Sequence, residues 1–469
     1  SGNGYTLTIN NGGSGNGTLY FNSTSGTINN AGTILGSIDN QTSSTIKSFN
    51  TGSINGSIIN NADATIETLN VTGNVTNGIR NDSNIGSLMV NESVNYSGTG
   101  SITNKIDVES GDTLTAGSGI TFNSTNGTIN NAGTINGNIT NIADSILTDF
   151  TNSGSISGTF TNEGHIVKFV NTNTGSINNF VNDNTISFFE NNGIITSFNG
   201  NNGTIYGVIN SKTITNGFEN VATSLLNKEN ALITGNVALK GTKQDCNNGN
   251  GICKTSDLIN EGTITGNVTN GAGKEINLVE NTGTIGGSIA NSGNINIFKV
   301  SGTIAQGIIN NDNASISSIT INKGANLGNS GITNNSNIGT FIVNESVKYT
   351  GNGSDRITQA LEVAQDKTLT IGSNGTLSFN SKNGSVNNLG TIAGNLANVS
   401  NSTLANFTNF GTTSQINGSI TNSGLITHLE NQGTISNSIT NNANATITSF
   451  KNSGTINGNI NNEGTITSI

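Results

Sequence analysis

The chain has 469 residues, of which 9% are charged, far below the roughly 25% of ordinary soluble domains. It contains 63 Gly and no Pro, which argues against disorder, because disordered chains are usually rich in Pro and charge. Asn, Gly, Thr and Ser are weak helix formers, so a packed helical domain is a poor fit. The net charge is −10 with two arginines, Arg80 and Arg356, so nucleic acid and anionic membranes, which require clustered Lys and Arg, are excluded as partners.

The two ends of the chain read like the interior of a longer protein. The chain opens in strand-like sequence, SGNGYTLTI, and stops inside a repeat, EGTITSI. No apolar stretch approaches the ~18–20 residues that span a membrane, and no basic-then-apolar leader is present. We therefore expect either a removed leader or an excised piece, and no membrane insertion by this segment.

Two short motifs alternate along the chain from its first quarter. The motif I-x-G-x-I begins at Ile34 and Ile54 and recurs loosely at Val75, while I-x-x-F/L begins at Ile46 and Ile66. Each motif returns after about 20 residues, and the two interleave at half that spacing. The same alternation continues at Ile135, Ile146, Ile156, Ile166, Ile177, Ile186, Ile195 and Ile205, and again at Ile416, Ile426, Ile435, Ile447, Ile456 and Ile466.

A repeat this short cannot bury its own apolar face and must stack on its neighbours. Asn-Asn, Asn-Gly and Ser-Gly pairs between the repeats tolerate the left-handed backbone of tight turns. The pattern predicts an all-β parallel β-helix with about 20 residues per turn, Ile, Val and Phe inside, and Asn and Thr in external or turn ladders. A flattened solenoid of ten residues per turn is the alternative; twenty is preferred because the two motifs differ, although the difference blurs between residues 150 and 200.

The sequence also contains a duplication of a unit longer than one turn. Residues 90–94, VNESV, reappear at 343–347, and residues 113–135 resemble residues 368–392. Residues 5–34 look like a third copy of the same unit. Such growth by duplication of several turns is more typical of long display proteins than of enzymes with one active site.

The stretch from 217 to 257 departs from the repeat. Phe218, Val221, Leu225 and Leu226 have helix-like spacing, so we expect a short helix or large loop that leaves the solenoid here. Excursions of this kind often carry binding function in repeat proteins, although a tolerated insertion without a role remains the alternative.

Cys246 and Cys253 are the two cysteines of the chain and bracket a small Gly/Asn loop. A zinc half-site is disfavoured because the spacing is long and no His lies nearby. A redox centre is disfavoured because the C-x-x-C arrangement is missing. The preferred interpretation is a disulfide that closes the loop in an exported protein.

The residues of enzyme chemistry are sparse. His165 and His428 are the two histidines and lie far apart in the sequence, and no G-x-S-x-G motif appears. The nearest acidic group is Asp107, Glu109 and Asp112, which we interpret as solvated turn carboxylates in preference to a weak calcium site. The sequence therefore predicts no enzyme, no cofactor and no bound metal.

With the repeat established, the chain resembles the passenger region of Gram-negative autotransporters, particularly the self-associating adhesins. The resemblance lies in the repeated G-T/S-I-x-N/G units, such as GTINNAGTINGNITN at 127–141, in the phrase TLTIGSNGTLSFNS at 368–381, and in the closely spaced cysteines. It implies that residues 1–469 form a single right-handed β-helix, exported and displayed at the outer membrane, although the leader and the translocator barrel are not in this sequence.

The function that the resemblance implies is adhesion. Low charge and rows of Asn, Ser and Thr suit a polar face that binds copies of itself on neighbouring cells, and the partner could also be a host-cell surface protein or glycan. The alternatives are a β-helix stalk that carries a hydrolase or lyase, an ice-binding solenoid with threonine rows, and a trimeric fibre.

Overall fold

The computed structural model describes residues 17–198, 203–239, 257–372 and 375–469. Across these residues the chain forms 55 strands and no helix. The chain divides into two compact units, with residues 1–222 and 232–234 in unit 1 and residues 223–231 and 235–469 in unit 2. Among the described residues there is therefore no helix that could cross a membrane.

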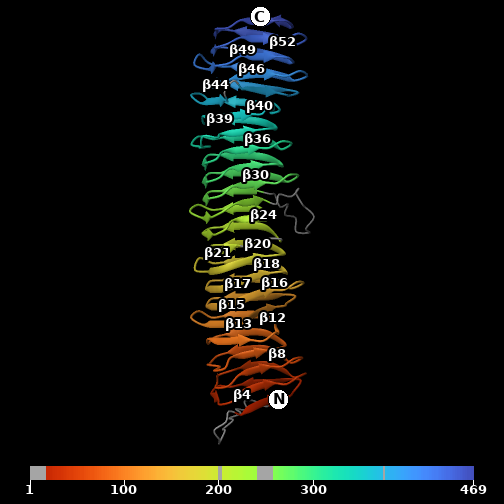
Figure 1. Ribbon diagram of the computed structural model, residues 1–469, viewed down its shortest axis with the longest axis vertical. Helices are drawn as coiled ribbons and strands as arrows, with labels where there is room; N and C mark the ends of the chain where they lie inside the picture. Colours follow the sequence, from red (N-terminus) through yellow and green to blue (C-terminus); the bar gives the residue numbers. More distant parts are fainter. Residues whose placement is uncertain (1–16, 199–202, 240–256, 373–374) are drawn as a thin grey trace. The chain divides into compact units, whose positions relative to one another are not determined.

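Each unit is a parallel β-solenoid with about 20 residues per turn, as the sequence predicts. A strand pairs with the equivalent strand one turn later: in unit 1, Phe150 lies opposite Phe169 and Asn152 opposite Asn171. The ribbon of Figure 1 shows the same stacking for β46 (Thr403–Asn409), β49 (Leu425–Asn431) and β52 (Thr446–Asn452). The period of twenty is thus confirmed over the alternative of ten.

The longer strands of successive turns form one ladder, which we call ladder A. In unit 1 it consists of β2 (Gly26–Asn29), β5 (Thr45–Asn50), β8 (Thr65–Val71), β10 (Asn84–Val90), β12 (Ser101–Val108), β14 (Gly127–Asn131), β16 (Ile146–Asn152), β18 (His165–Asn171), β20 (Thr185–Asn191) and β22 (Thr204–Asn210). In unit 2 it contains β27 (Asp257–Asn260), β30 (Glu275–Asn281), β33 (Asn294–Val300), β36 (Ser315–Ile321), β38 (Asn337–Val343), β40 (Arg356–Val363), β43 (Gly384–Asn388), β46, β49, β52 and β55 (Thr465–Ser468). Strand β24 (Phe218–Asn227) includes residues of both units.

The other half of each turn carries two shorter ladders. We call the T/S-I positions ladder B and the I-x-N or F-x-N positions ladder C; some strands contain both. In unit 1 these strands are β1 (Thr18–Phe21), β3 (Thr33–Ile34), β4 (Ser37–Asn40), β6 (Ser53–Ile54), β7 (Ile58–Asn60), β9 (Ile79–Asn81), β11 (Val94–Ser97), β13 (Thr113–Phe122), β15 (Thr134–Asn141), β17 (Ser155–Asn162), β19 (Ser176–Asn182), β21 (Ile194–Phe198), β23 (Thr213–Ile214) and β25 (Leu232–Ile233).

In unit 2 the strands of ladders B and C are β26 (Val237–Leu239), β28 (Thr263–Ile264), β29 (Val268–Asn270), β31 (Thr284–Ile285), β32 (Ile289–Asn291), β34 (Thr303–Ile304), β35 (Ile308–Asn310), β37 (Ile332–Asn334), β39 (Val347–Gly351), β41 (Thr368–Ile371), β42 (Thr376–Phe379), β44 (Thr391–Ala393), β45 (Asn395–Asn398), β47 (Gln415–Ile416), β48 (Ile420–Asn422), β50 (Thr434–Ile435), β51 (Ile439–Asn441), β53 (Thr455–Ile456) and β54 (Ile460–Asn462).

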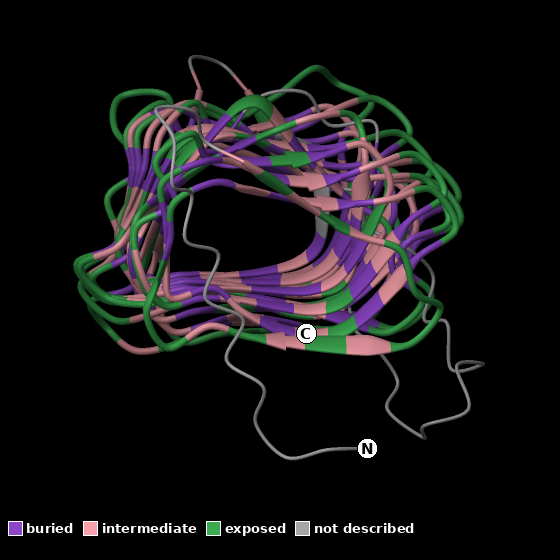
Figure 2. Cartoon of the chain, turned by 90° about the horizontal axis from the view of Figure 1, so that it is seen from below, coloured by how far each residue is buried: buried purple, intermediate pink, exposed green. Residues whose placement is uncertain are grey.

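The core is the inside of the coil. Along each strand, every second side chain points into it. Figure 2 shows buried and less buried residues alternating along the strands. In unit 1 the core contains two columns of phenylalanine rings. Phe150, Phe169 and Phe189 of ladder A stack nearly parallel at centroid distances of 4.5 and 4.7 Å. Phe160 and Phe180 of ladder C meet Phe169 edge to face, an arrangement that contributes ~0.5–1.5 kcal/mol per pair beyond area burial.

The tight turns rest on residues with left-handed backbone. Asp63, Asp144 and Asn444 have φ values of 59°, 65° and 67°, a region where Asn and Asp are enriched among non-glycine residues. The following residue is small and points inward, as Ala64 and Ala445 do. The recurrent phrase N-x-A/S-D/N-A/S therefore encodes the turn before a ladder A strand.

The helix predicted near residue 218 is wrong. Residues 218–227 form the strand β24, and Leu225 and Leu226 lie in register with Leu258 and Ile259 of β27. A strand here adds to the parallel ladder, and this pairing outweighs the helix-like spacing of the apolar residues. Residues 240–256 lie outside the described residues, and with them Cys246, Cys253 and their predicted disulfide.

Candidate functional site

Buried asparagines form ladders at the corners of the coil. In unit 1, the Nδ2 of Asn131 donates to the Oδ1 of Asn152, which donates in turn to Asn171, each at 2.8 Å. The chain continues to Asn191 and Asn210 at 2.8 and 2.9 Å. The sequence predicted external or turn ladders of Asn; these ladders do lie at turns, but their side chains are fully buried.

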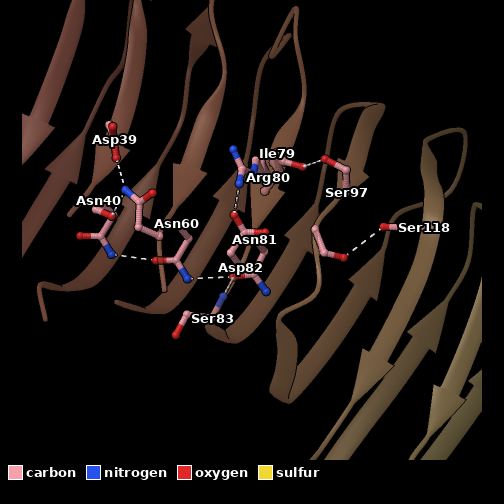
Figure 3. Close-up of polar contacts among 12 residues, drawn as sticks. Asp39, Asn40, Asn60, Ile79, Arg80, Asn81, Asp82, Ser83, Ser97 and Ser118 are labelled. Carbon is pink, nitrogen blue, oxygen red and sulfur yellow. Dashed lines mark hydrogen bonds and ion pairs between the residues drawn. The ribbon is translucent and has the colours of Figure 1, made fainter. Parts of the chain in front are cut away.

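Among the described residues, the buried asparagine ladders all run in one direction: the side-chain amide nitrogen of each Asn donates to the Asn of the following turn. Figure 3 shows the first of them, in which Asn40 donates to Asn60 and Asn60 to Asn81. Asn81 then donates to the hydroxyl of the buried Tyr96 at 3.0 Å, and burial raises the pKa of that tyrosine. In unit 2, Asn270, Asn291, Asn310 and Asn334 form the equivalent ladder, which ends on the hydroxyl of Tyr349.

The first asparagine of a ladder carries a buried carbonyl oxygen that accepts no hydrogen bond from the described residues. These oxygens are the Oδ1 atoms of Asn40, Asn131, Asn141, Asn270, Asn388 and Asn398. In the preceding turn an apolar residue stands opposite each of them, namely Phe21, Val108, Phe122, Leu239, Val363 and Phe379. A ladder thus begins wherever an apolar column gives way to asparagine.

In eleven segments of ladder B and the bend that follows it, the outer surface carries no charged residue; elsewhere ladder B does carry charge, at Lys348 of β39, which stands opposite Thr370 of β41. We define the uncharged face by residues 33–37, 53–57, 134–138, 155–159 and 176–179 in unit 1, and by residues 263–267, 284–288, 391–395, 415–419, 434–438 and 455–459 in unit 2. Most of these segments are the T/S-I-x-G-x phrases of the sequence. No Asp, Glu, Lys, Arg or His occurs in any of them.

Side chains on the uncharged face are held by hydrogen bonds between turns. In unit 1, Ser157 donates to the Oδ1 of Asn136 at 3.1 Å, and Asn179 donates to the hydroxyl of Thr159 at 3.0 Å. In unit 2, Ser436 donates to the Oδ1 of Asn417 at 3.0 Å. Gly418 is required at the bend, since a Cβ there would lie 2.0 Å from the carbonyl oxygen of Gly394.

The outer side of ladder A is different, because it carries charge. Asp149 and Lys168 stand opposite each other in unit 1. In unit 2, Glu430 and Lys451 form an ion pair at 3.2 Å. The segments of the uncharged face therefore present a surface chemically distinct from the outer side of ladder A.

The residues considered for chemistry from the sequence are not gathered into a site. Nε2 of His165, half-buried on β18, lies 3.0 Å from the hydroxyl of Ser187, and burial lowers the pKa of this histidine. His428 lies in unit 2, whereas His165 lies in unit 1. Asp107 pairs with Lys105 at 2.5 Å, while Glu109 is exposed. Within the described ranges no three His, Cys, Asp or Glu side chains group as metal ligands would.

The T-I-T threonines, which bear on the ice-binding alternative, lie on different ladders. Thr213 and Thr263 begin β23 and β28 of ladder B, whereas Thr446 and Thr465 begin β52 and β55 of ladder A. These four residues therefore do not form one threonine plane.

The fold and its ladders define this chain as a β-solenoid protein of about 21 turns. Comparisons with protein-family models, with curated proteins and with solved structures found no match.

Proposed function

We propose that the chain is a bacterial surface adhesin that binds copies of itself on neighbouring cells through the uncharged face. One observation carries the proposal: hydroxyl and amide side chains of this face are aligned turn after turn and held by hydrogen bonds, as between Ser157 and Asn136. Such side chains are ordered before they meet a partner, so less conformational entropy is lost on binding. The lack of charge on the face keeps repulsion between identical copies small.

The affinity of such a contact comes from the number of hydrogen bonds that form together. A single neutral hydrogen bond contributes ~0.5–1.5 kcal/mol net, which is too little for a stable complex. Many turns that meet at once between two crowded cell surfaces add their contributions, because each further contact is intramolecular. The same logic applies to attachment to a host-cell surface protein or glycan, which we keep as the alternative partner.

Display at the outer membrane of a Gram-negative cell is part of the proposal. It rests on the resemblance of the repeated phrases to autotransporter passengers, which also implies a right-handed coil. The proposed function includes no catalysis.

The proposal is tested by the settling of cells that display the chain. Cells with the native chain should flocculate, and an excess of purified chain should block the flocculation. Lysines placed on the uncharged face by Thr434→Lys with Thr455→Lys should abolish settling, since each copy would then repel its partner.

The matched control is Thr446→Lys with Thr465→Lys on ladder A. The members of both pairs stand in register one turn apart, and in both pairs the first threonine is half-buried and the second exposed. If the two double variants disperse the cells equally, the uncharged face is not the contact surface. If cells with the native chain stay dispersed, self-association is wrong and host attachment becomes the function to test.

A further inference from the structure

A cavity of about 640 Å³ opens on unit 2 beside β39 and β42, within the size range of small-ligand sites. Four polar side chains contribute to its lining, those of Lys348, Thr350, Thr376 and Ser378. Ile371 provides an apolar wall, and four glycines complete the lining. The surface is thus rich in hydroxyl groups, with one cation and one aliphatic patch.

The cavity exists because the strand stacking is interrupted. β39 pairs with the preceding turn through Tyr349, Thr350 and Gly351, but with the following strand β41 only through residues 347–349. β42 pairs with the following turn along its whole length, whereas towards the preceding turn its one register partner is Ile357, opposite Phe379. Short strand edges therefore face the cavity from both sides.

The duplicated segment of unit 1 is shorter than that of unit 2 at both of these places. Ser101 and Arg356 occupy equivalent register positions, so residues 97–100 correspond to the longer stretch 350–355. On the opposite wall, Phe122 follows Ala116 by six residues (122 − 116), whereas Phe379 follows Ile371 by eight (379 − 371). In unit 1 the shorter wall closes on its neighbour, where Ser118 donates to the carbonyl of Gly98 at 3.1 Å. In the second copy, Thr350, Gly351 and Gly353 line one side of the cavity, and Gly372, Gly375 and Thr376 line the other.

The enlarged wall at 350–356 is held by a buried carboxylate. Asp355 is 1% exposed and accepts hydrogen bonds from the Tyr349 hydroxyl at 2.7 Å and from the Gly353 amide at 2.9 Å. Arg356 donates to the carbonyls of Gly353 and Asp355 at 2.8 and 2.7 Å. These bonds hold the loop in shape, and the residues that line the cavity supply the groups for ligand recognition.

Lys348 supplies the charge. Its side chain is exposed, and it has no ion-pair partner among the described residues. The equivalent residue in the unit 1 copy is the uncharged Asn95, since Val94–Tyr96 and Val347–Tyr349 pair in the same way with the next turn. A free ammonium group beside three hydroxyls is an environment for an anionic, hydroxyl-rich molecule.

We propose that this cavity binds an acidic saccharide. The carboxylate or sulfate of the sugar contacts Lys348, its hydroxyls exchange hydrogen bonds with Thr350, Thr376 and Ser378, and the apolar side of the ring lies against Ile371. The lining glycines let the ring approach the backbone. An inorganic anion would leave the hydroxyls unused, and a peptide strand needs a longer free edge than this one. The proposal does not rest on self-association through the uncharged face.

The test is the titration of the full chain with three probes, with binding measured by saturation-transfer NMR and by calorimetry. The probes are methyl β-D-glucuronide, its neutral match methyl β-D-glucoside, and inorganic sulfate. The glucuronide should bind ~2–5-fold more tightly than the glucoside, the usual effect of one exposed ion pair. Lys348→Gln should remove this difference, whereas Lys323→Gln, at an exposed lysine elsewhere in unit 2, should leave it unchanged.

Thr376→Phe should fill the cavity and abolish the binding of both sugars. Because this change could disturb the fold, Thr376→Val provides a second variant that keeps the shape, removes one hydroxyl and should weaken both sugars alike. Absence of sugar binding at millimolar concentration overturns the proposal. Binding that survives both Thr376 variants, or sulfate that binds as tightly as the glucuronide, would show an unspecific anion site and overturn it equally.

Discussion

The direction of the asparagine ladders predicts that the same substitution has unequal effects at neighbouring rungs. We compare Asn152→Val, within a ladder of unit 1, with Asn131→Val at its start. In the native chain Asn152 accepts from Asn131 and donates to Asn171, both at 2.8 Å, and also donates to the carbonyls of Gly154 and Ser176. Valine at 152 therefore removes all of these bonds and leaves the Oδ1 of Asn171 without its ladder donor.

The magnitudes follow from these contacts. A newly unsatisfied buried group costs ~1–3 kcal/mol and each lost neutral hydrogen bond ~0.5–1.5 kcal/mol, so Asn152→Val should destabilise its turn by ~2–5 kcal/mol. Asn131→Val removes the orphaned Oδ1 of Asn131 and creates one on Asn152, so the number of orphans is unchanged. It also extends the valine column that ends at Val108. We expect a cost of ~0–1 kcal/mol, because the lost bond to the Ser155 carbonyl is offset by apolar packing.

The assay is native-state hydrogen exchange of the full chain, read by mass spectrometry. Repeat proteins do not unfold in one step, so a single unfolding free energy is poorly defined, whereas exchange reports local opening. Amides of residues 146–171 should exchange at least about 30-fold faster in Asn152→Val, since 1.4 kcal/mol corresponds to a factor of ten. Asn130→Val, on the outward side of the same strand as Asn131, controls for the change of residue type. Equal loss of protection in the Asn131 and Asn152 variants would refute the directional ladder, and no loss in either would show that these bonds contribute little.

Four further predictions follow. The Lys367 ammonium lowers the pKa of Glu345 to about 2 with the help of the Gly324 and Ser346 amides, so the stabilisation from the ionised carboxylate is present above the ordinary pKa near 4.5 and is lost as the pH falls towards 2. Lys367→Met should raise the pKa of Glu345 towards 4.5, as an NMR titration will show. Asn444 has a φ of 67°, so Asn444→Val should cost ~1–3 kcal/mol and Asn444→Gly much less, measured by exchange of the β52 amides. Phe169→Ala should cost ~3–5 kcal/mol by opening the aromatic core, more than Val167→Ala on the outer side of the same strand, compared by the same method. We expect a disulfide between Cys246 and Cys253, so reduction should change the mass of the intact chain; an unchanged mass would rule the disulfide out.

The sequence predicts the solenoid well because apolar residues recur at a fixed spacing. It predicts Asn ladders that lie outside or at turns, and the ladders do lie at turns, but it does not predict that their side chains are buried, since Asn is usually exposed. A signal was present: in I-x-N and F-x-N the strand period of two puts Asn on the same side as Ile or Phe, as with Phe150 and Asn152. The helix expected near Phe218 failed because four apolar residues fit a paired strand equally well. The one sign of the cavity in the sequence is that the duplicated segments differ in length. This difference marks where the two copies differ, but it does not show that they enclose a space.

Along β33, β36 and β38 of unit 2 the two corners of a turn are filled differently, and there the difference specifies how the turns pair. In unit 2, the ladder C corner carries Asn291, Asn310 and Asn334, while the ladder A corner carries Val300, Ile321 and Val343. A chain that paired half a turn out of step would place buried amides against aliphatic residues, so each amide would lose both its donor and its acceptor.

In residues 384–452 of unit 2, buried asparagines fill both corners, so this safeguard is missing there. Residues 146–198 of unit 1 lack it too, because both halves of their turns read F-x-N. The same stretch blurs the two motifs in the sequence. Its correct pairing must come from the turns and from the outer charges, such as Asp149 opposite Lys168. Where the two corners differ, a buried asparagine thus contributes to the choice between two similar pairings as well as to the stability of its turn, a role that buried asparagine also has in coiled coils.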